Sequence, residues 1–211
     1  MNHGGTAVTD LVELETIVGS PLPHVRGKTR TRLHELDRQW LAASPLCFIA
    51  TADAAGNADV SPKGDPPGFT IVLDDTTIAI PERPGNRRAD GFHNLLENPR
   101  VGLIFVIPGR GDTLRINGRA RMLRDVPYAE RMRVRGHEPR LVLEVSVEEV
   151  FSHCSKAFLR SKLWKPETWE PDAMPRRAQI SKTLERQDTD LAELEQYYGK
   201  AYEEKIYQVK Y

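Results

Sequence analysis

The sharpest chemical feature of the sequence is a basic turn, PERPGNRR, at residues 81–88. It leaves an apolar stretch, enters a helical pattern and carries Arg83, Arg87 and Arg88 within six residues. A helix start offers unpaired backbone N–H groups and the positive end of a dipole, arginines add charge-assisted hydrogen bonds, and Gly85 lets the backbone approach a ligand. Because arginines at a helix start oppose the dipole, a bound anion is favoured. We therefore predict a phosphate site here; the alternative is a solvated basic turn.

A second candidate is the segment DVSPKGD at residues 59–65. Ser61 and Lys63 could hydrogen-bond the polar edge of a ligand, while Pro62 and Gly64 shape the backbone around it. The alternative is an ordinary polar turn. A serine–lysine nucleophile pair is set aside, because the sequence indicates no base or oxyanion partner nearby.

The third candidate is FSHCSKAFLRSKLW at residues 151–164, where polar side chains alternate with large apolar ones. Phe158 and Trp164 could wall an aromatic ring, with Lys156 and Ser161 as donors to it; the alternative is simple packing. One histidine beside one cysteine provides too few ligands for a metal, so no metal site is expected.

Most of the elements that must position these segments are short strands. Between residues 114 and 123, apolar Leu114 and Ile116 alternate with Arg115 and Asn117, which is the period of two of a sheet with one wet face. Asp53 begins a stretch with the chemistry of a hairpin turn. Strands are predicted at residues 46–51, 69–73, 77–80, 101–107, 114–123 and 141–147, with a second strand ending near residue 65.

Helical spacing of apolar residues predicts the helices. The first main helix spans residues 29–44, where Leu33, Leu36, Trp40 and Leu41 recur and Pro45 ends the pattern. We further expect a helix at residues 86–97 with Leu95 and Leu96 inward, a charged helix at residues 188–205 and a short amphipathic helix near residues 11–18.

Composition restricts the class of protein. The 211 residues carry 30 basic and 30 acidic side chains, so no overall field attracts nucleic acid or an anionic membrane, and any anion site must be local. No apolar run is long enough to cross a bilayer, no signal peptide is recognisable and the two cysteines form no framework, so we expect a cytoplasmic protein. We predict an N-terminal arm (1–28), one main domain (29–165) and a C-terminal loop and helical extension (166–211).

In this order, the segments resemble the pyridoxamine 5′-phosphate oxidase family and its FMN-binding relatives. The resemblance covers roughly residues 46–147. It rests on the hairpin FIATADAAGNADVSPKGD, the strand and basic turn IAIPERPGNRRADGFHNLLENPRVGLIFV, and LRINGRARML, which is similar to the family's RIxGxxxxL strand. The stretch HCSKAFLRSKLW resembles that of an uncharacterised shorter branch of the family.

The resemblance implies a mostly β fold with flanking helices (α+β), a split β-barrel that pairs as a homodimer with FMN between the subunits. It implies that Asn86, Arg87 and Arg88 hold the FMN phosphate, and that Ser61 and its neighbours run along the isoalloxazine ring. The expected cofactor-binding residues are Ser61, Pro62, Lys63, Pro81, Arg83, Asn86, Arg87, Arg88, Thr113, Lys156 and Ser161.

The chain ends differently from a pyridoxamine 5′-phosphate oxidase, which closes with an Arg-x-His substrate motif and a strand containing tryptophan. A charged tail, DLAELEQYYGKAYEEKIYQVKY, takes that place, so activity on pyridoxamine phosphate is not expected. The leading prediction is an FMN-dependent oxidoreductase of unknown substrate, without an assigned catalytic residue; His153 and Lys156 are candidate proton donors. The alternatives are a non-catalytic flavin, haem or deazaflavin binding or storage protein, and a structural dimer whose arginine turn forms interface ion pairs.

Overall fold

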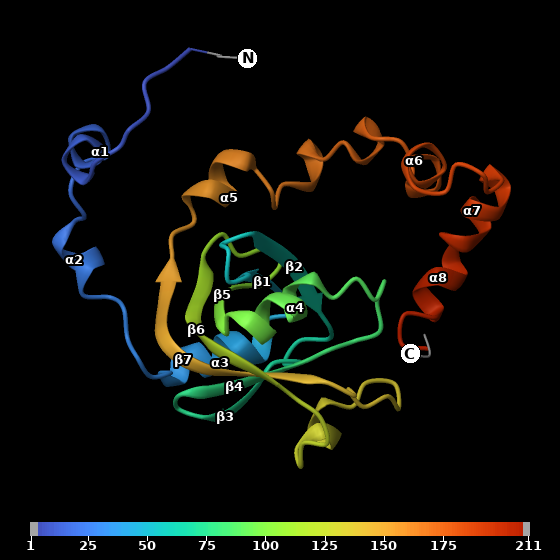
Figure 1. The fold of residues 1–211 in the computed structure, drawn as a ribbon, viewed down its shortest axis with the longest axis horizontal. Helices are drawn as coiled ribbons and strands as arrows, with labels where there is room; N and C mark the ends of the chain where they lie inside the picture. Colours follow the sequence, from blue (N-terminus) through green and yellow to red (C-terminus); the bar gives the residue numbers. More distant parts are fainter. Residues whose placement is uncertain (1–3, 209–211) are drawn as a thin grey trace.

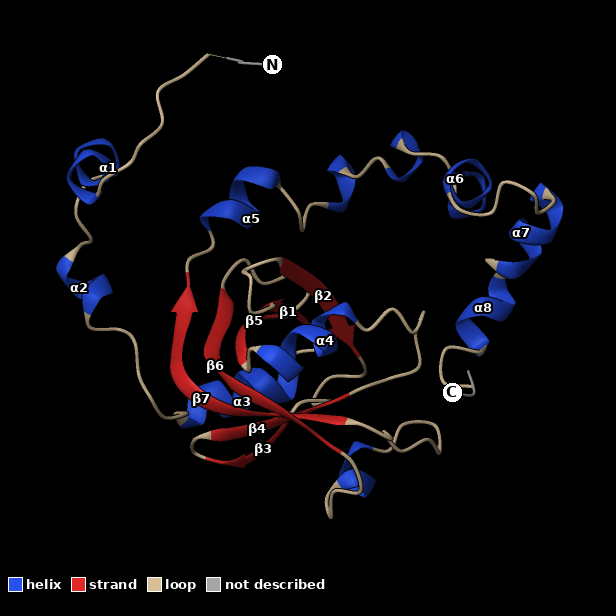
Figure 2. Ribbon diagram, in the orientation of Figure 1, coloured by secondary structure: helices blue, strands red, loops and turns tan. Residues whose placement is uncertain are grey.

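A computed structural model describes residues 4–208 of the chain (Figure 1). Its centre is one antiparallel seven-stranded sheet in the order β2-β1-β5-β6-β7-β4-β3. The strong curl of the sheet is visible in Figure 2, and β2 and β3 remain as its two edges. The strands are β1 (Leu46–Ala52), β2 (Ala58–Gly64), β3 (Ile71–Asp74), β4 (Thr77–Pro81), β5 (Arg100–Val106), β6 (Thr113–Leu123) and β7 (Val142–His153).

The prediction of a mostly β fold with flanking helices is confirmed, and most strands lie within one or two residues of their predicted bounds. β7 is the main exception, because it continues six residues past the expected end at residue 147. Its second half pairs with β6 as far as Thr113 opposite His153, so cross-strand pairing extends it where the apolar alternation becomes weak. The segment at residues 59–65, predicted at the end of the second strand, is largely strand β2, so the alternative of an ordinary polar turn is wrong.

β7 joins the two parts of the sheet. Its first half pairs with β4 on one side, and its whole length pairs with β6 on the other. The register shifts between Asn117 and Gly118, where the backbones come very close: a Cβ at position 118 would lie 2.0 Å from the carbonyl oxygen of Ser146. Only glycine fits this bulge, which explains the glycine of the RIxG motif in structural terms.

The helix predicted at residues 29–44 is α3 (Glu35–Ala43), which begins six residues later than expected. His34 caps its start by accepting a hydrogen bond from the Leu36 N–H, and the Asp37 carboxylate accepts from the His34 N–H. Leu33 and Leu41 are buried as predicted, whereas Leu36 is exposed to solvent. The residues before the cap do not join the helix, because the backbone of Arg30 forms a β-bridge with Val150 of β7.

The other helical predictions hold in position but not in extent. The helix expected at residues 86–97 is α4 (Asp90–Glu97), whose inward residue is Leu95; the prediction that Leu96 points inward is wrong, since it is exposed. The charged helix at residues 188–205 is divided by Gly199 into α7 (Leu191–Tyr197) and α8 (Lys200–Glu204).

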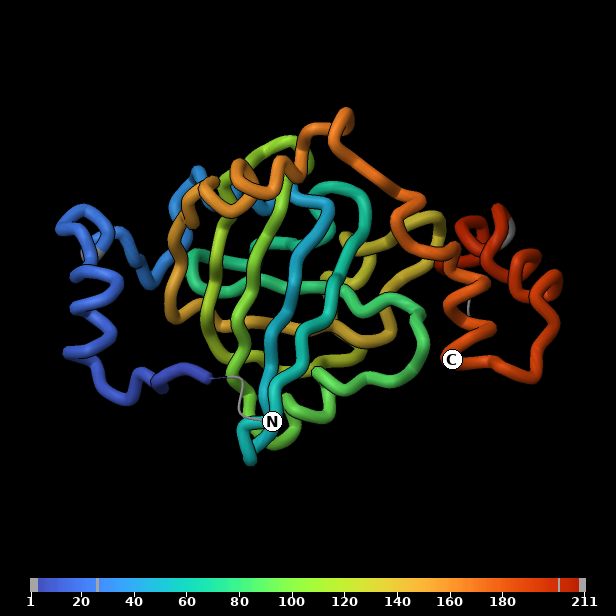
Figure 3. The backbone as a smooth tube through the Cα atoms, turned by 90° about the horizontal axis from the view of Figure 1, so that it is seen from above, coloured from blue at the N-terminus to red at the C-terminus, as the bar shows by residue number. Residues whose placement is uncertain are grey.

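The remaining elements lie around the sheet. The N-terminal arm, with α1 (Leu11–Val18) and α2 (Pro23–Arg26), and the C-terminal segment, which begins with α6 (Arg177–Leu184), flank the sheet on opposite sides (Figure 3). Helix α5 (Lys156–Ser161) follows β7. Within residues 4–208 there are also three short 3-10 helices: η1 (Ala129–Met132), η2 (Pro166–Thr168) and η3 (Pro171–Ala173). In the part of the chain that the structure describes, no helix is long and apolar enough to span a membrane.

One main core fills the curled sheet. Fully buried Phe105, Ile78 and Ile116 come from β5, β4 and β6, and Leu41 of α3 and Leu95 of α4 complete it. Burial of this apolar surface is the dominant stabilising contribution to the fold. The core fixes β1, β2 and α4 relative to one another, and these three elements frame the site described next.

Candidate functional site

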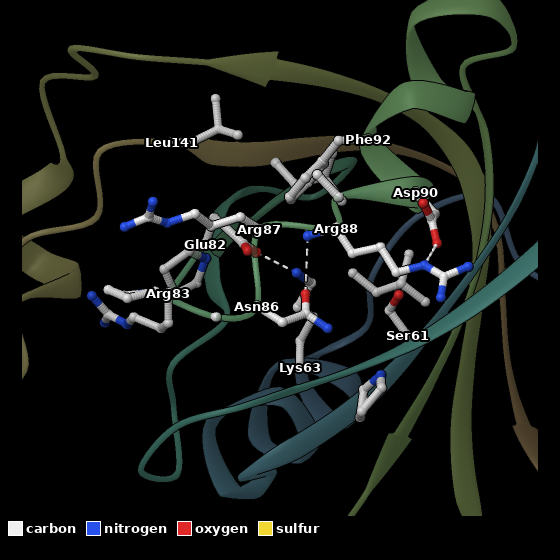
Figure 4. A pocket seen from close by; sticks show the side chains of 18 of the residues that line it. Ser61, Lys63, Glu82, Arg83, Asn86, Arg87, Arg88, Asp90, Phe92 and Leu141 are labelled. Carbon is white, nitrogen blue, oxygen red and sulfur yellow. Dashed lines mark hydrogen bonds and ion pairs between the residues drawn. The ribbon is translucent and has the colours of Figure 1, made fainter. Parts of the chain in front are cut away.

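A groove of about 1180 Å³ lies between β2, the end of β4 and the start of α4 (Figure 4). Its volume exceeds the ~300–1,000 Å³ of most small-molecule pockets, so a ligand of cofactor size can enter it. Eight of the sequence-predicted residues line this groove: Ser61, Pro62, Lys63, Pro81, Arg83, Asn86, Arg87 and Arg88.

The floor of the groove follows from the period of two in the strands. Asp59, Ser61 and Lys63 of β2 lie on one face and oppose Thr51, Ile49 and Cys47 of β1 in register. The Ser61 hydroxyl lies 3.0 Å from Asp59 Oδ2. Because β2 is an edge strand, Pro62 is tolerated there without loss of an internal sheet hydrogen bond.

Burial raises the pKa of the Cys47 thiol to about 12, although the nearby Lys63 ammonium acts in the opposite direction. A thiol held protonated is a poor nucleophile. Cys47 is therefore a packing residue beneath the groove.

One wall is built where β4 ends, and the roles of its residues differ. Lys63 forms an ion pair with Glu82, and both side chains are four-fifths buried. The Lys63 Nζ also lies 4.7 Å from the centre of the Phe92 ring, a cation–π contact. These contacts orient Lys63 across the groove (Figure 4).

Arg83, predicted as a cofactor ligand, directs its guanidinium into the protein. Its Nε bonds to Asp65 at 2.5 Å, one Nη donates to the Met132 carbonyl at 2.5 Å and the other to the His137 carbonyl at 3.3 Å. The Asp65 side chain is 1% exposed. Arg83 thus ties the groove wall to the 129–137 segment, and its donors are engaged within the fold.

The loop before α4 is the most distinctive backbone of the groove. Arg87 and Ala89 have φ values of +64° and +57°, a left-handed conformation that costs free energy for residues other than glycine. The Asn86 side chain accepts a hydrogen bond from the Arg88 N–H at 3.0 Å, and Arg88 pairs with Asp90. Strain of this kind persists only where the surroundings hold it, and it concentrates at binding sites.

The placement of this loop corrects the predicted helix start. Asn86, Arg87 and Arg88 lie before the helix and not in its first turn, because α4 begins at Asp90 after the left-handed residue Ala89. Ala89, Asp90 and Gly91 still line the groove, and among the described residues no side-chain hydrogen bond caps the helix. The helix start and the two arginines therefore meet at the same end of the groove. Gly85 has no close neighbour that would exclude a side chain.

The groove has a positive local charge in a chain that is neutral overall. Five basic and three acidic side chains line it, and because the buried Asp65 neutralises Arg83 from behind the wall, the net excess is one positive charge. The basic ones are Lys63, Arg83, Arg87, Arg88 and Arg140. A groove with this excess attracts anions.

Sequence reasoning missed two tyrosines of the C-terminal segment, one that lines the groove and one that packs behind its wall. Tyr202 of α8 lines the groove. Tyr207 donates its hydroxyl hydrogen to the buried Asp65, stacks on His137 with a ring separation of 6.4 Å, and contacts the Arg83 guanidinium. The only sequence signal for them was a set of tyrosines in an otherwise charged tail.

Three predicted residues do not line this groove. Thr113 is buried at the start of β6 and pairs with His153. Lys156 and Ser161 lie on α5, where the Ser161 hydroxyl bonds to the carbonyl of Phe158 in its own helix. Their assignment as cofactor contacts stays a prediction that depends on a second subunit.

The donor set of the groove suits an aromatic phosphate ester. Arginines, an asparagine and a helix start suit phosphate. Ser61 and the edge of β2 offer hydrogen bonds to a polar ring edge, while Ile49, Phe69 and Phe92 provide apolar surface. Among residues 4–208, no group of three or more His, Cys, Asp or Glu side chains is placed to hold a metal ion.

Comparison with known proteins identifies the family. The sequence model for pyridoxamine 5′-phosphate oxidase matches residues 33–154, which is more than half of the chain. A search of curated proteins returns no match.

Among solved structures, HupZ of Group A Streptococcus is 22% identical with a TM-score of 0.46, covering 57% of this chain and 93% of its own. An FMN-binding protein of Syntrophomonas wolfei is 14% identical with a TM-score of 0.41, covering 56% and 89%. A FAD-binding protein of Mesorhizobium loti is 19% identical with a TM-score of 0.40, covering 59% and 96%. On the sequence match, the chain belongs to the pyridoxamine 5′-phosphate oxidase family.

Proposed function

We propose that this protein binds FMN in the groove and is an FMN-dependent oxidoreductase. The observation that carries the proposal is the meeting of Arg87, Arg88 and the uncapped start of α4 at one end of a groove with excess positive charge. The comparisons support it, since two of the similar structures are flavin-binding proteins.

In this proposal each part of the groove has its own task. Asn86, Arg87, Arg88 and the α4 start hold the phosphate, and the face of β2 with Ser61 and Lys63 receives the ring. When bound, the flavin supplies hydride or electron transfer, and the protein supplies orientation and electrostatics.

We further propose that the protein is a homodimer through the outer face of the sheet. Across β2, β1 and β5, the register aligns Pro62, Phe48 and Ile104. Phe48 and Ile104 are 37% and 38% exposed, and the neighbouring Val60 is 62% exposed. Exposed apolar residues that adjoin on a sheet favour a covering partner, and a twofold partner could bring Thr113, Lys156 and Ser161 to the groove.

The phosphate assignment is tested by the double variant Arg87→Ala/Arg88→Ala. Removing one arginine that bonds to the phosphate should cost about 1.5–3 kcal/mol of binding free energy. FMN affinity should therefore fall at least ~100-fold when both are removed. Titration of apo-protein with FMN, followed by flavin fluorescence, measures it. Arg124→Ala is the matched control, because Arg124 is 84% exposed and lies outside the groove. Wild-type affinity in the double variant, with an unchanged circular dichroism spectrum, would exclude these residues as the phosphate site.

Catalysis is tested separately from binding. The FMN-loaded protein is mixed with NADH or NADPH without oxygen, and the flavin absorbance is followed. Bleaching at a rate well above that of free FMN supports the oxidoreductase. Bleaching by dithionite alone would reduce the proposal to flavin binding or storage. A protein that ignores FMN but takes up haem or a deazaflavin would contradict the cofactor assignment.

A further inference from the structure

A second group of basic side chains lies outside the groove, at the ends of β6 and β7. Lys28 and Arg115 lie over the ring of Phe151, and His153 follows Phe151 by two residues on the same strand; these four residues are called the Phe151 cluster below. The Lys28 Nζ lies 5.2 Å and the Arg115 Cζ 5.1 Å from the ring centre. His153 is two residues from Phe151 on β7, and both cations act on its imidazole.

The backbone fixes this arrangement. Arg30 exchanges two hydrogen bonds with Val150, of 3.0 and 2.7 Å, so the end of the N-terminal arm is attached to β7. Lys28 then donates from Nζ to the Ser152 carbonyl at 2.9 Å. Arg115 lies directly opposite Phe151 in the β6–β7 register. Three separate segments thus bring their charges to one place.

The charge of the cluster is not neutralised within residues 4–208. No carboxylate there forms an ion pair with Lys28, Arg115 or His153. Glu149, the acidic residue nearest along β7, accepts a hydrogen bond from Asn117 at 2.8 Å instead.

Two physical signs show that this arrangement is costly. The Arg115 Nε is buried without a hydrogen-bond partner in the described part of the chain. A buried donor left unpaired costs roughly 1–3 kcal/mol. The pKa of His153 is lowered, first by burial and then by the charges of Arg115 and Lys28, so a further positive charge is disfavoured here.

We propose that the Phe151 cluster binds an oxyanion, a phosphate or a carboxylate, carried by the substrate. An oxyanion would provide the missing acceptor for Arg115 and neutralise the like charges. Thr113, which pairs with His153, adjoins the cluster and is the residue that the family resemblance puts near the flavin. The assignment to a substrate therefore rests on the proposed flavin function, whereas anion binding itself does not.

Nuclear magnetic resonance of His153 tests the proposal on the full-length protein, with the variant His153→Gln assigning its signal among the six histidines. The protein is titrated with inorganic phosphate, and in a parallel series with acetate, both in apo form and saturated with FMN. Binding places a negative charge beside the imidazole and should raise the pKa of His153 by about 1. If only phosphate changes the pKa of His153, the cluster accepts a phosphoryl group. If both anions change it, the cluster accepts carboxylates as well.

Variants separate the cluster from general surface charge. Arg115→Ala and Lys28→Ala should weaken phosphate binding about tenfold or more, the loss of one charge-assisted hydrogen bond. Arg119→Ala, an exposed arginine on the same strand, should bind like the wild type. Lys28 lies on the arm outside the core, so its variant remains informative if Arg115→Ala fails to fold.

Three outcomes would overturn the proposal. The first is a pKa of His153 that does not respond to either anion. The second is equal loss of binding in Arg119→Ala. The third is loss of the response in FMN-saturated protein, because the cluster would then hold the cofactor phosphate. FMN titration of the same samples reports on the groove independently, so failure of flavin binding would leave the anion result interpretable.

Discussion

Of the three arginines in the basic turn, Arg83 differs from Arg87 and Arg88 in where its donors point. Its side chain is 14% exposed and bonds to buried Asp65 and two carbonyls, whereas Arg88 is 78% exposed. Sequence spacing could not separate these roles, since all three have the same chemistry within six residues. Only the long-range contact with the 129–137 segment distinguishes them.

At this scale we predict that Arg83→Ala destabilises the fold. Removing one partner of a buried ion pair leaves Asp65 charged and uncompensated, which costs roughly 3–5 kcal/mol. Urea unfolding followed by tryptophan fluorescence measures the change. Arg88→Ala is the comparison and should stay within ~0.5 kcal/mol of the wild type, because exposed ion pairs contribute little. Equal stability of the two variants would show that Arg83 has no structural role.

At the scale of elements, the sequence correctly predicted those strands and helices whose position is determined by local residue patterns. β1, β4, β5 and β6 were predicted closely because alternation and turn residues lie within a few positions of each other. The start of α4 was not, because the left-handed backbone at Arg87 and Ala89 is held by tertiary packing and has no side-chain signal. The eight groove residues lie in two segments that residue chemistry already singled out, residues 59–65 and 81–88, while Tyr202 and Tyr207 required the fold of a distant tail.

The C-terminal segment gives a second prediction, on Tyr207→Phe. The variant loses the hydrogen bond to Asp65 but keeps the ring, so the segment beyond Gly199 should detach more often. We expect faster trypsin cleavage at Lys200 and faster FMN release, measured by flavin fluorescence after dilution. The variant Tyr197→Phe, on an exposed tyrosine of α7, is the control. Unchanged cleavage and release would argue against a docked segment.

The same contact should make the segment sensitive to alkaline pH. Burial, and then the hydrogen bond to Asp65, raise the pKa of Tyr207 to about 12. The folded state therefore holds Tyr207 as the neutral phenol above pH ~10, the ordinary pKa of tyrosine, where the unfolded chain would lose the proton. The stabilisation is complete below pH ~10 and is lost as the pH rises toward 12. Protection from trypsin should fall in that pH window in the wild type but not in Tyr207→Phe. The pKa of Tyr128 is also raised to about 12, but Tyr128 is present in both proteins, so the comparison cancels its effect.

Gly118→Ala is the third prediction. A Cβ 2.0 Å from the Ser146 carbonyl oxygen cannot be accommodated without moving β6 away from β7. We expect the free energy of unfolding to fall by several kcal/mol, seen as a lower thermal midpoint, or the variant to fail to fold. Gly56→Ala controls for glycine loss, because nothing lies within 4 Å of its Cβ, although its φ of +88° adds a smaller cost. A fold as stable as the wild type would mean that the bulge is not rigid.

At the scale of the whole molecule, the fourth prediction concerns assembly. The variant Phe48→Asp puts a charge into the exposed apolar row on the sheet and should convert a dimer into a monomer. Light scattering coupled to gel filtration distinguishes 23.9 kDa from twice that mass. Leu36→Asp is the control, since Leu36 is 67% exposed on α3. If the proposed site is shared between subunits, Phe48→Asp should also bind FMN more weakly; a wild-type protein that is monomeric would refute the assembly.

The position of β7 has a consequence for how the chain is made. β3 and β4 pair with each other, and among the strands that the structure describes only β7 attaches them to the rest of the sheet. During synthesis from the N-terminus, this hairpin must wait without its neighbour until residues 142–146 have left the ribosome. The N-terminal arm, although made first, can dock only after Val150 has been added. A nascent chain arrested before residue 142 should therefore expose both strand edges to chaperones, and the sheet closes late and in one step.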